Sequence, residues 1–360
     1  MKSEDSWVRY LFREWMLGVS ALGLVVTSLY ATHLPHLAAS ELQVLFLLWV
    51  LFVASGGLAR TGLLERISRA MERGRFASSK LVLATFLLSM VATNDVALVV
   101  LVPLTLASNL PRRDAVVILQ AFAANAGSAL TPIGNPQNLF IFWYFQIAPL
   151  DFITSIAPFS LLMFGVLAAG SMALERQSST SKHEVETVAP PRKKISPREW
   201  TAMALLLFAI LIVLRVLPLS LGAVVVSGTL VLDRRALRVD YGLLLTFVCL
   251  FGLTENLRGL LDSYLEHPAH TFLFSALTSQ VVSNVPAALI FAKFTSHWEA
   301  LLWGTNVGGF GSLLASLSNL IAYKLFIRGK NRQQTLSFTL RFLGAGYLLF
   351  ILGVVFYWFR

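Results

Sequence analysis

The 360-residue sequence has one cysteine, Cys249, and little charge. A single cysteine excludes a disulfide within the chain and a metal cluster built on cysteine ligands. Charged residues make up 13% of the sequence, which is about half of their usual share in soluble domains. The zinc-binding pattern HExxH is absent, and the apolar runs contain no Ser/His pair and no paired aspartates. We therefore expect neither a soluble globular protein nor an enzyme.

Hydrophobic residues are what the sequence has in excess. They make up 56% of the chain, and the mean hydropathy is +0.70. Apolar runs of bilayer-spanning length recur along the sequence, which predicts an all-α polytopic membrane protein embedded in the lipid bilayer. The net charge of +10 lies mostly in short loops between these runs, as the positive-inside rule predicts, so we expect no nucleic-acid partner. This distribution predicts a cytoplasmic N-terminus and an extracytoplasmic C-terminus.

The first half, residues 1–175, begins with two predicted scaffold helices within 15–59. An amphipathic helix over 60–80 follows, because apolar residues recur there at helical spacing among basic ones. The apolar segment 81–107 carries Thr93, Asn94 and Asp95 at its centre. Basic residues flank both of its ends, so both ends are expected on the cytoplasmic side. We therefore predict a re-entrant helical hairpin there instead of a single span.

The apolar run over 115–145 contains Gly127, Pro132, Gly134 and Pro136 within the stretch NAGSALTPIGNPQNL. Proline removes a backbone donor and clashes with the preceding helical turn, so this run predicts a broken transmembrane helix. Backbone groups freed at membrane depth are tolerated where they line a cavity or are buried in protein, and such breaks build transport sites. A proline kink repaired by neighbouring helices is the alternative. A helix over 152–174 is predicted to close this half.

The second half resembles the first. A hydrophilic stretch over 176–198 predicts a cytoplasmic linker, and residues 199–360 follow it. We predict helices within 200–257, a hairpin over 271–294, a broken helix over 300–325 and a last helix over 337–358. Asn125 and Asn306 are 181 positions apart, as are Asn138 and Asn319. Together with the loop charges, this register predicts two repeats of inverted topology.

Polar residues at the hairpin tips and breaks form the candidate binding site. Amide, hydroxyl and carbonyl oxygens suit Na⁺, and helix N-termini suit an anion. Asp95 is the one acidic residue in these elements, and an ionisable residue inside a membrane is functional by default. It is predicted to ligate Na⁺ or carry a proton, with a helix N-cap role as the alternative. The candidates are Thr93, Asn94, Asp95, Asn125, Gly127, Ser128, Thr131, Gly134, Asn135, Asn138, Ser283, Asn284, Asn306, Gly308, Ser312 and Asn319, with Na⁺ at Asn94, Asp95, Asn125 and Asn135.

Two cationic residues, Arg215 and Lys293, lie in the apolar part of the chain. Arg215, at the end of a predicted span, is expected to snorkel to the membrane interface. Lys293 is expected on the extracytoplasmic side of the membrane or at a membrane interface.

Three motifs give the sequence a family resemblance. These are TPIGNPQNL at 131–139, Thr93-Asn94-Asp95 with Pro103 downstream, and SNVPA at 283–287. With them the chain resembles the arsenite permease and NhaD-type Na⁺/H⁺ antiporter branch of the ion transporter superfamily, which also includes citrate carriers and divalent anion/sodium symporters. It is most similar to bacterial inner-membrane permeases of this group. The resemblance implies a scaffold domain that is often dimeric, so a homodimer is a candidate assembly, and an elevator-like transport domain.

These observations predict a secondary active transporter working by alternating access. Its expected cargo is a small anion or oxyanion, arsenite-like, inorganic or carboxylate, coupled to Na⁺ or H⁺; no cofactor is expected apart from Na⁺ as a coupling ion. A Na⁺/H⁺ antiporter in which Asp95 exchanges the two ions is the alternative. A passive channel is a less favoured one, because the second half has no counterpart of the Asn135-Pro136 step.

Overall fold

The computed structural model describes residues 15–31, 36–71, 76–178, 194–261 and 267–360. Every regular element within these ranges is helical. The helices up to the predicted linker are α2 (Trp15–Ala31), α3 (Ala39–Ala59), α4 (Leu63–Met71), α5 (Ala77–Ala92), α6 (Asn94–Ala107), α7 (Arg113–Ala129), α8 (Pro136–Tyr144) and α9 (Pro149–Ser178). Those after it are α10 (Pro197–Val213), η1 (Leu219–Leu221), α11 (Gly222–Leu232), η2 (Arg234–Leu237), α12 (Tyr241–Leu261), α13 (Pro268–Val282), α14 (Asn284–Ala292), α15 (Trp298–Gly308), α16 (Leu317–Ile327) and α17 (Arg332–Phe359).

The boundaries differ from the predictions in the first half mainly around residue 80. The predicted amphipathic helix over 60–80 is shorter, because α4 ends at Met71, and the first arm of the hairpin begins at Ala77 instead of 81. Phe76 before it has a left-handed backbone conformation with φ of 67°. The Glu175 carboxylate accepts hydrogen bonds from the backbone N–H and the hydroxyl of Ser79 at 3.1 Å each. These bonds satisfy polar groups of the first turn, so this serine-containing segment joins the helix.

The predicted linker is shortened at both ends. Helix α9 continues to Ser178, and α10 begins at Pro197 because Ser196 and Glu199 form a capping box. The central part of the linker, 179–193, lies outside the described residues. The end of the next predicted helix also moves, since α10 stops at Val213 and Arg215 adopts a left-handed conformation with φ of 62°.

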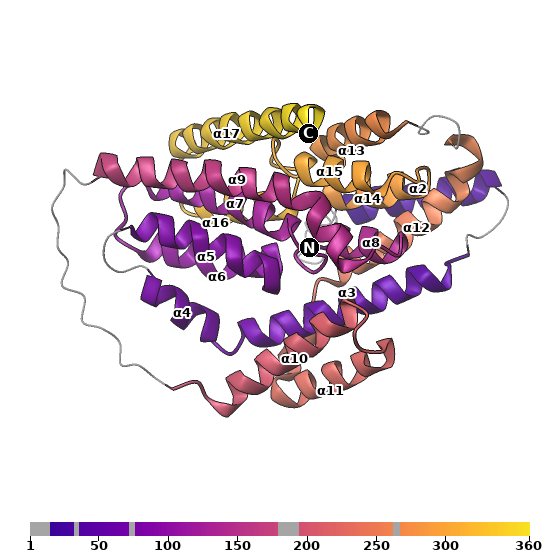
Figure 1. Ribbon diagram of the computed structural model, residues 1–360, viewed down its shortest axis with the longest axis horizontal. Coiled ribbons are helices and arrows are strands. Elements are labelled where there is room, and N and C mark those ends of the chain that lie inside the picture. Colours follow the sequence, from indigo (N-terminus) through magenta and orange to yellow (C-terminus); the bar gives the residue numbers. More distant parts are fainter. Residues whose placement is uncertain (1–14, 32–35, 72–75, 179–193, 262–266) are drawn as a thin grey trace, which may run out of the picture.

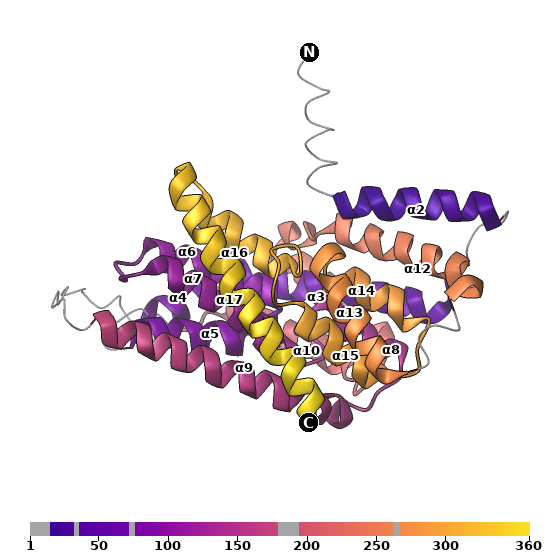
Figure 2. The ribbon, with the colours of Figure 1, turned by 90° about the horizontal axis from the view of Figure 1, so that it is seen from above.

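Helix α3 runs between two groups of helices. Helices α10 and α11 lie along one side of it, at the bottom of Figure 1, and η2 also contacts it. On the other side lie α5 to α8 and α13 to α16, with α9 and α17 covering them at the top of Figure 1. Helix α2 packs along α12, as Figure 2 shows from above. Among the described residues, four helical segments are long and apolar enough to cross a membrane: Ala39–Ala59, Pro149–Arg176, Arg234–Leu257 and Arg332–Phe359.

Two glycines allow the interrupted helices to pack closely against the hairpins. A Cβ at Gly127 in α7 would lie 2.1 Å from the carbonyl oxygen of Phe86 in α5. A Cβ at Gly308 in α15 would lie 2.6 Å from the Cβ of Ser279 in α13. Small residues at such contacts let helix backbones approach closely. The resulting van der Waals packing is a main contribution to the association of apolar helices in lipid. Gly127 and Gly308 therefore have a packing role in the two halves.

Arg215 makes specific contacts that the sequence did not predict. Its guanidinium donates hydrogen bonds to the carbonyl oxygens of Phe142 at 2.7 Å and Ile147 at 3.0 Å. It also lies over the rings of Phe142 and Trp143, with its Cζ 4.5 and 5.0 Å from their centroids. Arg215 thus binds carbonyls at the C-terminal end of α8, where the helix dipole favours a cation.

Lys293 follows α14 and is buried within the protein, with 6% of its side chain exposed. Its Nζ lies 2.8 Å from Glu41 Oε1 of α3 and 2.9 Å from Glu255 Oε2 of α12. A buried lysine is retained when it is paired and hydrogen-bonded in this way. The ion pairs attach the end of the second hairpin to α3 and α12.

Substituting Gly127 by alanine should lower stability. Because the new Cβ would meet the Phe86 carbonyl, α7 must move away from α5, and overpacking of this kind typically costs about 1–3 kcal/mol. Thermal unfolding in detergent measures the effect. Gly165→Ala in α9 is the matched control, since its Cβ would meet no atom within 4 Å. Equal melting temperatures of the two variants would contradict the close approach.

The ion pair between Arg66 and Glu199 predicts a pH dependence at the polar end of α10. Hydrogen bonds from the Arg66 guanidinium, followed by the backbone N–H of Ser196, lower the pKa of Glu199 from 4.5 to about 2. A carboxyl group with a lowered folded-state pKa stabilises the fold above its unfolded-state pKa, and this contribution is lost as the pH falls through the folded-state value. The melting temperature of the wild type should therefore exceed that of Glu199→Gln at neutral pH.

This difference should shrink as the pH falls from 4.5 toward 2. Glu65→Gln is the control, because Glu65 forms only an exposed pair with Arg69 at 3.8 Å. A difference that stays constant over this pH range would show that the Glu199 charge has no such effect.

Candidate functional site

The first interruption separates α7, which ends at Ala129, from α8, which begins at Pro136. The Asn138 side-chain amide satisfies backbone groups freed there, because its Nδ2 lies 3.0–3.2 Å from the carbonyl oxygens of Ser128, Ala129 and Thr131. Asn135 caps α8 by accepting a hydrogen bond from the N–H of Asn138 at 2.9 Å. Residues 132–138 are buried by protein, and Asn138 is fully buried. The segment is therefore an interruption supported by side chains, not a lipid-facing kink.

The second interruption repeats two of these hydrogen bonds at the same 181-residue offset, while the side-chain cap made by Asn135 has no counterpart at Ser316. Helix α15 ends at Gly308 and α16 begins at Leu317. Here the Asn319 Nδ2 donates to the carbonyl oxygens of Gly309 and Ser312, at 3.0 Å each. Gly309 and Ser312 lie 181 positions after Ser128 and Thr131, whose carbonyl oxygens accept hydrogen bonds from Asn138 in the first half. The sequence register thus corresponds to an equivalence of hydrogen bonds.

Two asparagine pairs join the interruptions to each other. Asn125 in α7 donates from Nδ2 to Asn319 Oδ1 at 2.8 Å. In the reciprocal pair, Asn306 in α15 donates from Nδ2 to Asn138 Oδ1 at 2.8 Å. Each asparagine that repairs one break is therefore held by an asparagine from the other half. All four are at most 5% exposed, and in such a buried network each amide depends on the others for satisfaction.

The hairpin tips attach to the same cluster. Thr93 and Ser283 separate the arms of the two hairpins and have nearly identical backbone angles, with φ of 69° and 75°. Positive φ is unfavourable for these residue types, and such strain persists where the surroundings enforce it. Beyond them, the N–H of Asn94 bonds the Gly134 carbonyl at 3.0 Å, and the N–H of Asn284 bonds the Ala315 carbonyl at 2.9 Å.

Four helix N-termini consequently meet in one place. Helices α6 and α14 begin at the hairpin tips, while α8 and α16 begin just after the interruptions that those tips contact. Helix N-termini carry unpaired N–H groups and the positive end of the helix dipole. The arrangement therefore favours negative charge, although none of the candidate residues is Lys or Arg.

Asp95 connects the first hairpin to the second half of the protein. Its Oδ1 accepts a hydrogen bond from the hydroxyl of Ser318, in the first turn of α16, at 3.0 Å. The predicted Na⁺ ligands do not all point to one partner. Asn94 contacts the first interruption through its backbone, Asp95 contacts α16, and the Asn125 amide donates to the Gly309 carbonyl at 3.2 Å. These three residues therefore have separate partners, which lie in both halves of the protein.

Three polar residues of the cluster are not among the candidates predicted from the sequence. Ser318 bonds Asp95, Ser316 donates to Asn125 Oδ1 at 3.0 Å, and Gln280 bonds the backbone of the second interruption. The register of the repeat could have indicated Ser318, because Ser318-Asn319-Leu320 lies 181 positions after Gln137-Asn138-Leu139. Gln280 carries no comparable signal, since its counterpart in the first half is apolar.

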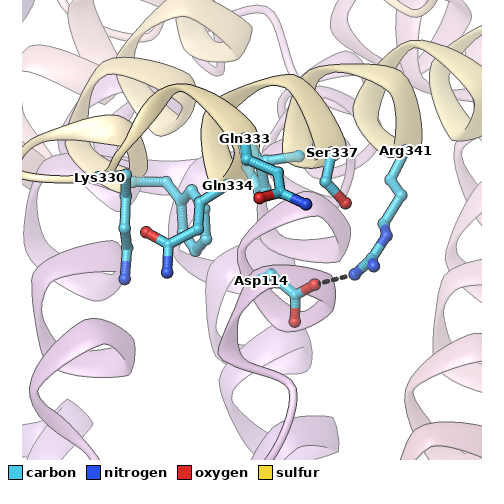
Figure 3. Close-up of a pocket in the computed structure, with 8 residues that line it drawn as sticks. Asp114, Lys330, Gln333, Gln334, Ser337 and Arg341 are labelled. Carbon is cyan, nitrogen blue, oxygen red and sulfur yellow. Dashed lines mark hydrogen bonds and ion pairs between the residues drawn. The ribbon is translucent and has the colours of Figure 1, made fainter.

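Two surface cavities lie elsewhere. One of about 370 Å³ lies between the start of α7 and the start of α17, and Figure 3 shows Asp114 pointing toward Arg341 across it. An adjoining cavity of about 420 Å³ is lined by Arg112, Arg113 and Arg328. Neither includes any of the candidate residues. The candidate site is therefore the buried polar cluster between the two interruptions.

An apolar helical protein with interrupted helices joined by buried amides has the architecture of a membrane transport protein. Comparison with known families agrees. Residues 7–308 match CitMHS, the citrate transporter family, and the chain belongs to this family. It is thus a multi-pass membrane transporter and not an enzyme, and the resemblance to the superfamily that includes citrate carriers is confirmed.

Three relatives support this assignment. The uncharacterized transporter MJ0456 of Methanocaldococcus jannaschii is 33% identical over 296 residues, which cover 79% of this chain and 81% of the relative. The inner membrane protein YbiR of Escherichia coli is 35% identical over 308 residues, with coverage of 80% and 81%. The silicon efflux transporter LSI3 of rice, Oryza sativa subsp. japonica, is 34% identical over 137 residues, which cover 36% of this chain and 28% of the relative.

The reciprocal asparagine pairs predict energetic coupling between the halves. In a double-mutant cycle of Asn125→Ala and Asn319→Ala, the two changes should be non-additive by about 0.5–3 kcal/mol, because both remove the same hydrogen bond. Reversible unfolding in detergent measures the coupling free energy. A control cycle pairs Asn125→Ala with Asn331→Ala, an exposed helix cap. Additive effects in the first cycle would contradict the pairing.

Proposed function

We propose that this protein is a secondary active transporter that moves a small anion or oxyanion by alternating access, coupled to Na⁺ or H⁺. The observation that carries the proposal is the convergence of four helix N-termini on the asparagine cluster, through the contacts of Asn94 with Gly134 and Asn284 with Ala315. N–H groups and helix dipoles bind an anion without a cationic side chain. A site of this kind binds and releases a charged cargo without a strong ion pair.

The cargo class has independent support from the comparisons. The family is described as citrate transporters, and one relative is named a silicon efflux transporter. A carboxylate or an inorganic oxyanion presents several oxygen acceptors to N–H donors, which is the complement of this site. We therefore place the cargo among carboxylates and small oxyanions, arsenite-like species included.

The proposed membrane arrangement follows the internal repeat. In it α5–α6 and α13–α14 are re-entrant hairpins in two repeats of inverted topology, with the N-terminus cytoplasmic and the C-terminus extracytoplasmic. The kinship with an E. coli inner membrane protein supports the bacterial inner membrane as the location. Helices α2, α3, α10, α11 and α12 would form the scaffold, and a homodimer would assemble on the scaffold. The hairpins and interrupted helices would move against it as the transport domain.

Coupling is assigned to the first hairpin. Asp95 is the acidic residue nearest the cluster, and its contact with Ser318 joins the hairpin tip to α16. A proton on Asp95, or a Na⁺ held by Asp95 with amide and carbonyl oxygens of Asn94, Asn125 and Asn135, would change the charge at this contact. Either ion would thereby favour one arrangement of the hairpin over the other.

A second candidate function is cation/proton antiport. Asp95 and its contact with Ser318 support this function as well. A carboxylate at this position could exchange Na⁺ for H⁺ without any anionic cargo. The two functions are separable in proteoliposomes. Sodium-driven proton flux without any added anion would support the antiporter, and saturable anion uptake that requires an ion gradient would support the anion carrier.

Replacing Asp95 by asparagine should abolish ion-coupled transport and leave the protein folded. The amide keeps the size of the side chain and can still accept a hydrogen bond from Ser318, but it cannot take up a proton or neutralise a cation. Uptake by proteoliposomes with and without an ion gradient, together with melting temperature, measures both parts of the prediction.

Asp151→Asn is the control, since Asp151 is exposed at the start of α9. It should transport like the wild type. Coupled transport by the Asp95 variant that equals the wild type in rate and pH dependence would rule out the proposed role of this carboxylate.

A further inference from the structure

The side chain of Gln280, near the end of α13, lies among backbone groups of the second interruption. Its Nε2 is 2.8 Å from the carbonyl oxygen of Gly308, 3.0 Å from that of Phe310 and 3.3 Å from that of Ala276. Its Oε1 accepts a hydrogen bond from the N–H of Ser312 at 2.9 Å. Three carbonyl oxygens thus surround one amide nitrogen.

The orientation of this amide is determined by its surroundings. With the two amide atoms exchanged, the oxygen would face three carbonyl oxygens and the nitrogen would face an N–H group, which leaves every contact unsatisfied. A cluster of carbonyl oxygens around a positively polarised group is also the environment that a metal cation requires. The Nε2 group therefore occupies a position suited to a cation.

The first half has no counterpart of this side chain. Met90 lies 190 positions before Gln280, the offset that also separates Asn94 from Asn284. The backbone equivalence is close, since Thr131 donates from its hydroxyl to the Met90 carbonyl at 2.7 Å and Ser312 donates to the Gln280 carbonyl at 2.7 Å. A methionine side chain has no donor, so the two halves differ in the chemistry at this position.

The backbone of the second interruption is adapted to Gln280. Gly311 has φ of 95°, and a Cβ there would lie 2.3 Å from Gln280 Oε1. The first half has Leu130 at the equivalent position, with an ordinary φ of −69°. The pair Gln280 and Gly311 therefore replaces the pair Met90 and Leu130.

The two halves also differ at the position of the acidic residue Asp95. Val285 lies 190 positions after Asp95, directly beyond the tip of the second hairpin, and it is buried. The second half thus lacks the carboxylate at this tip and has an amide donor among its carbonyl groups.

We propose that the Gln280 amide stands in for a cation at the second interruption, so that coupling ions bind in the first half alone. The stand-in role of Gln280 is argued from hydrogen bonds within this chain. The consequence for coupling rests on the proposed transport function.

Gln280→Glu tests the stand-in role, because glutamate has the same shape but no donor when ionised. Its carboxylate would face the carbonyl oxygens of Gly308 and Phe310 and would require a cation. At alkaline pH, replacing choline chloride by NaCl at equal concentration should raise the melting temperature of Gln280→Glu by several degrees more than that of the wild type. Gln333→Glu, at an exposed position in α17, controls for the added charge and should respond like the wild type.

Gln280→Met serves as the second variant if the glutamate variant does not fold. It places the first-half residue at the equivalent position and leaves the carbonyl groups without their donor, so it should also gain a Na⁺ response beyond that of the wild type. A Na⁺ response equal to that of the wild type in every folded variant would overturn the stand-in role.

Flux measurements test the consequence for coupling separately. In proteoliposomes, the wild-type rate should depend on the coupling-ion concentration with a Hill coefficient of about one, because cooperativity requires more than one site. A coefficient clearly above this value would overturn the restriction to the first half while leaving the proposed transport function intact. Flux that ignores every ion gradient would overturn the proposed function, whereas the Na⁺ response of the Gln280 variants would still support the stand-in role.

Discussion

Backbone groups freed inside an apolar helical bundle must find partners within the protein, and this constraint governs the structure around the site. Asn138 and Asn319 meet it by donating to carbonyl oxygens of their own interruptions. Each amide has a limited number of donors and acceptors, so its oxygen needs a partner as well. Asn306 and Asn125 from the opposite halves supply that partner. Local repair of the breaks therefore ties the two halves together.

This repair leaves the helix N-termini directed at one region. The hairpin tips reach the interruptions through single backbone hydrogen bonds, at Asn94 and Asn284, and the strained tip residues have the same conformation in both halves. Side chains add to these bonds, since Ser318 donates to Asp95 and Ser312 donates to the Gln280 carbonyl, while Lys293 attaches the far end of the second hairpin to α3 and α12. The hairpin tips and the amide cluster therefore belong to one hydrogen-bonded region.

The two halves share a backbone arrangement but differ in charge chemistry. The first half has Asp95 and Met90 where the second has Val285 and Gln280. Equivalent backbones permit this divergence because the hydrogen bonds that close each interruption come from the asparagines. Residues at the tips and at the ends of the first hairpin arms are then free to specialise. The Asp95–Ser318 hydrogen bond, which joins the two halves, has no counterpart at Val285.

The sequence alone determined the positions of the helix interruptions and the register of the repeat. Pro132 and Pro136 indicate the first interruption, because proline acts on the local backbone whatever surrounds it. The paired asparagines indicate the register of the repeat. The sequence also determined the membrane class, through composition. Only the tertiary structure decided which asparagine bonds which carbonyl, that Ser318 meets Asp95, and that Arg215 binds the end of α8. The reason is physical: a polar side chain accepts many partners, and those chosen here lie far away in sequence and are brought near by helix packing.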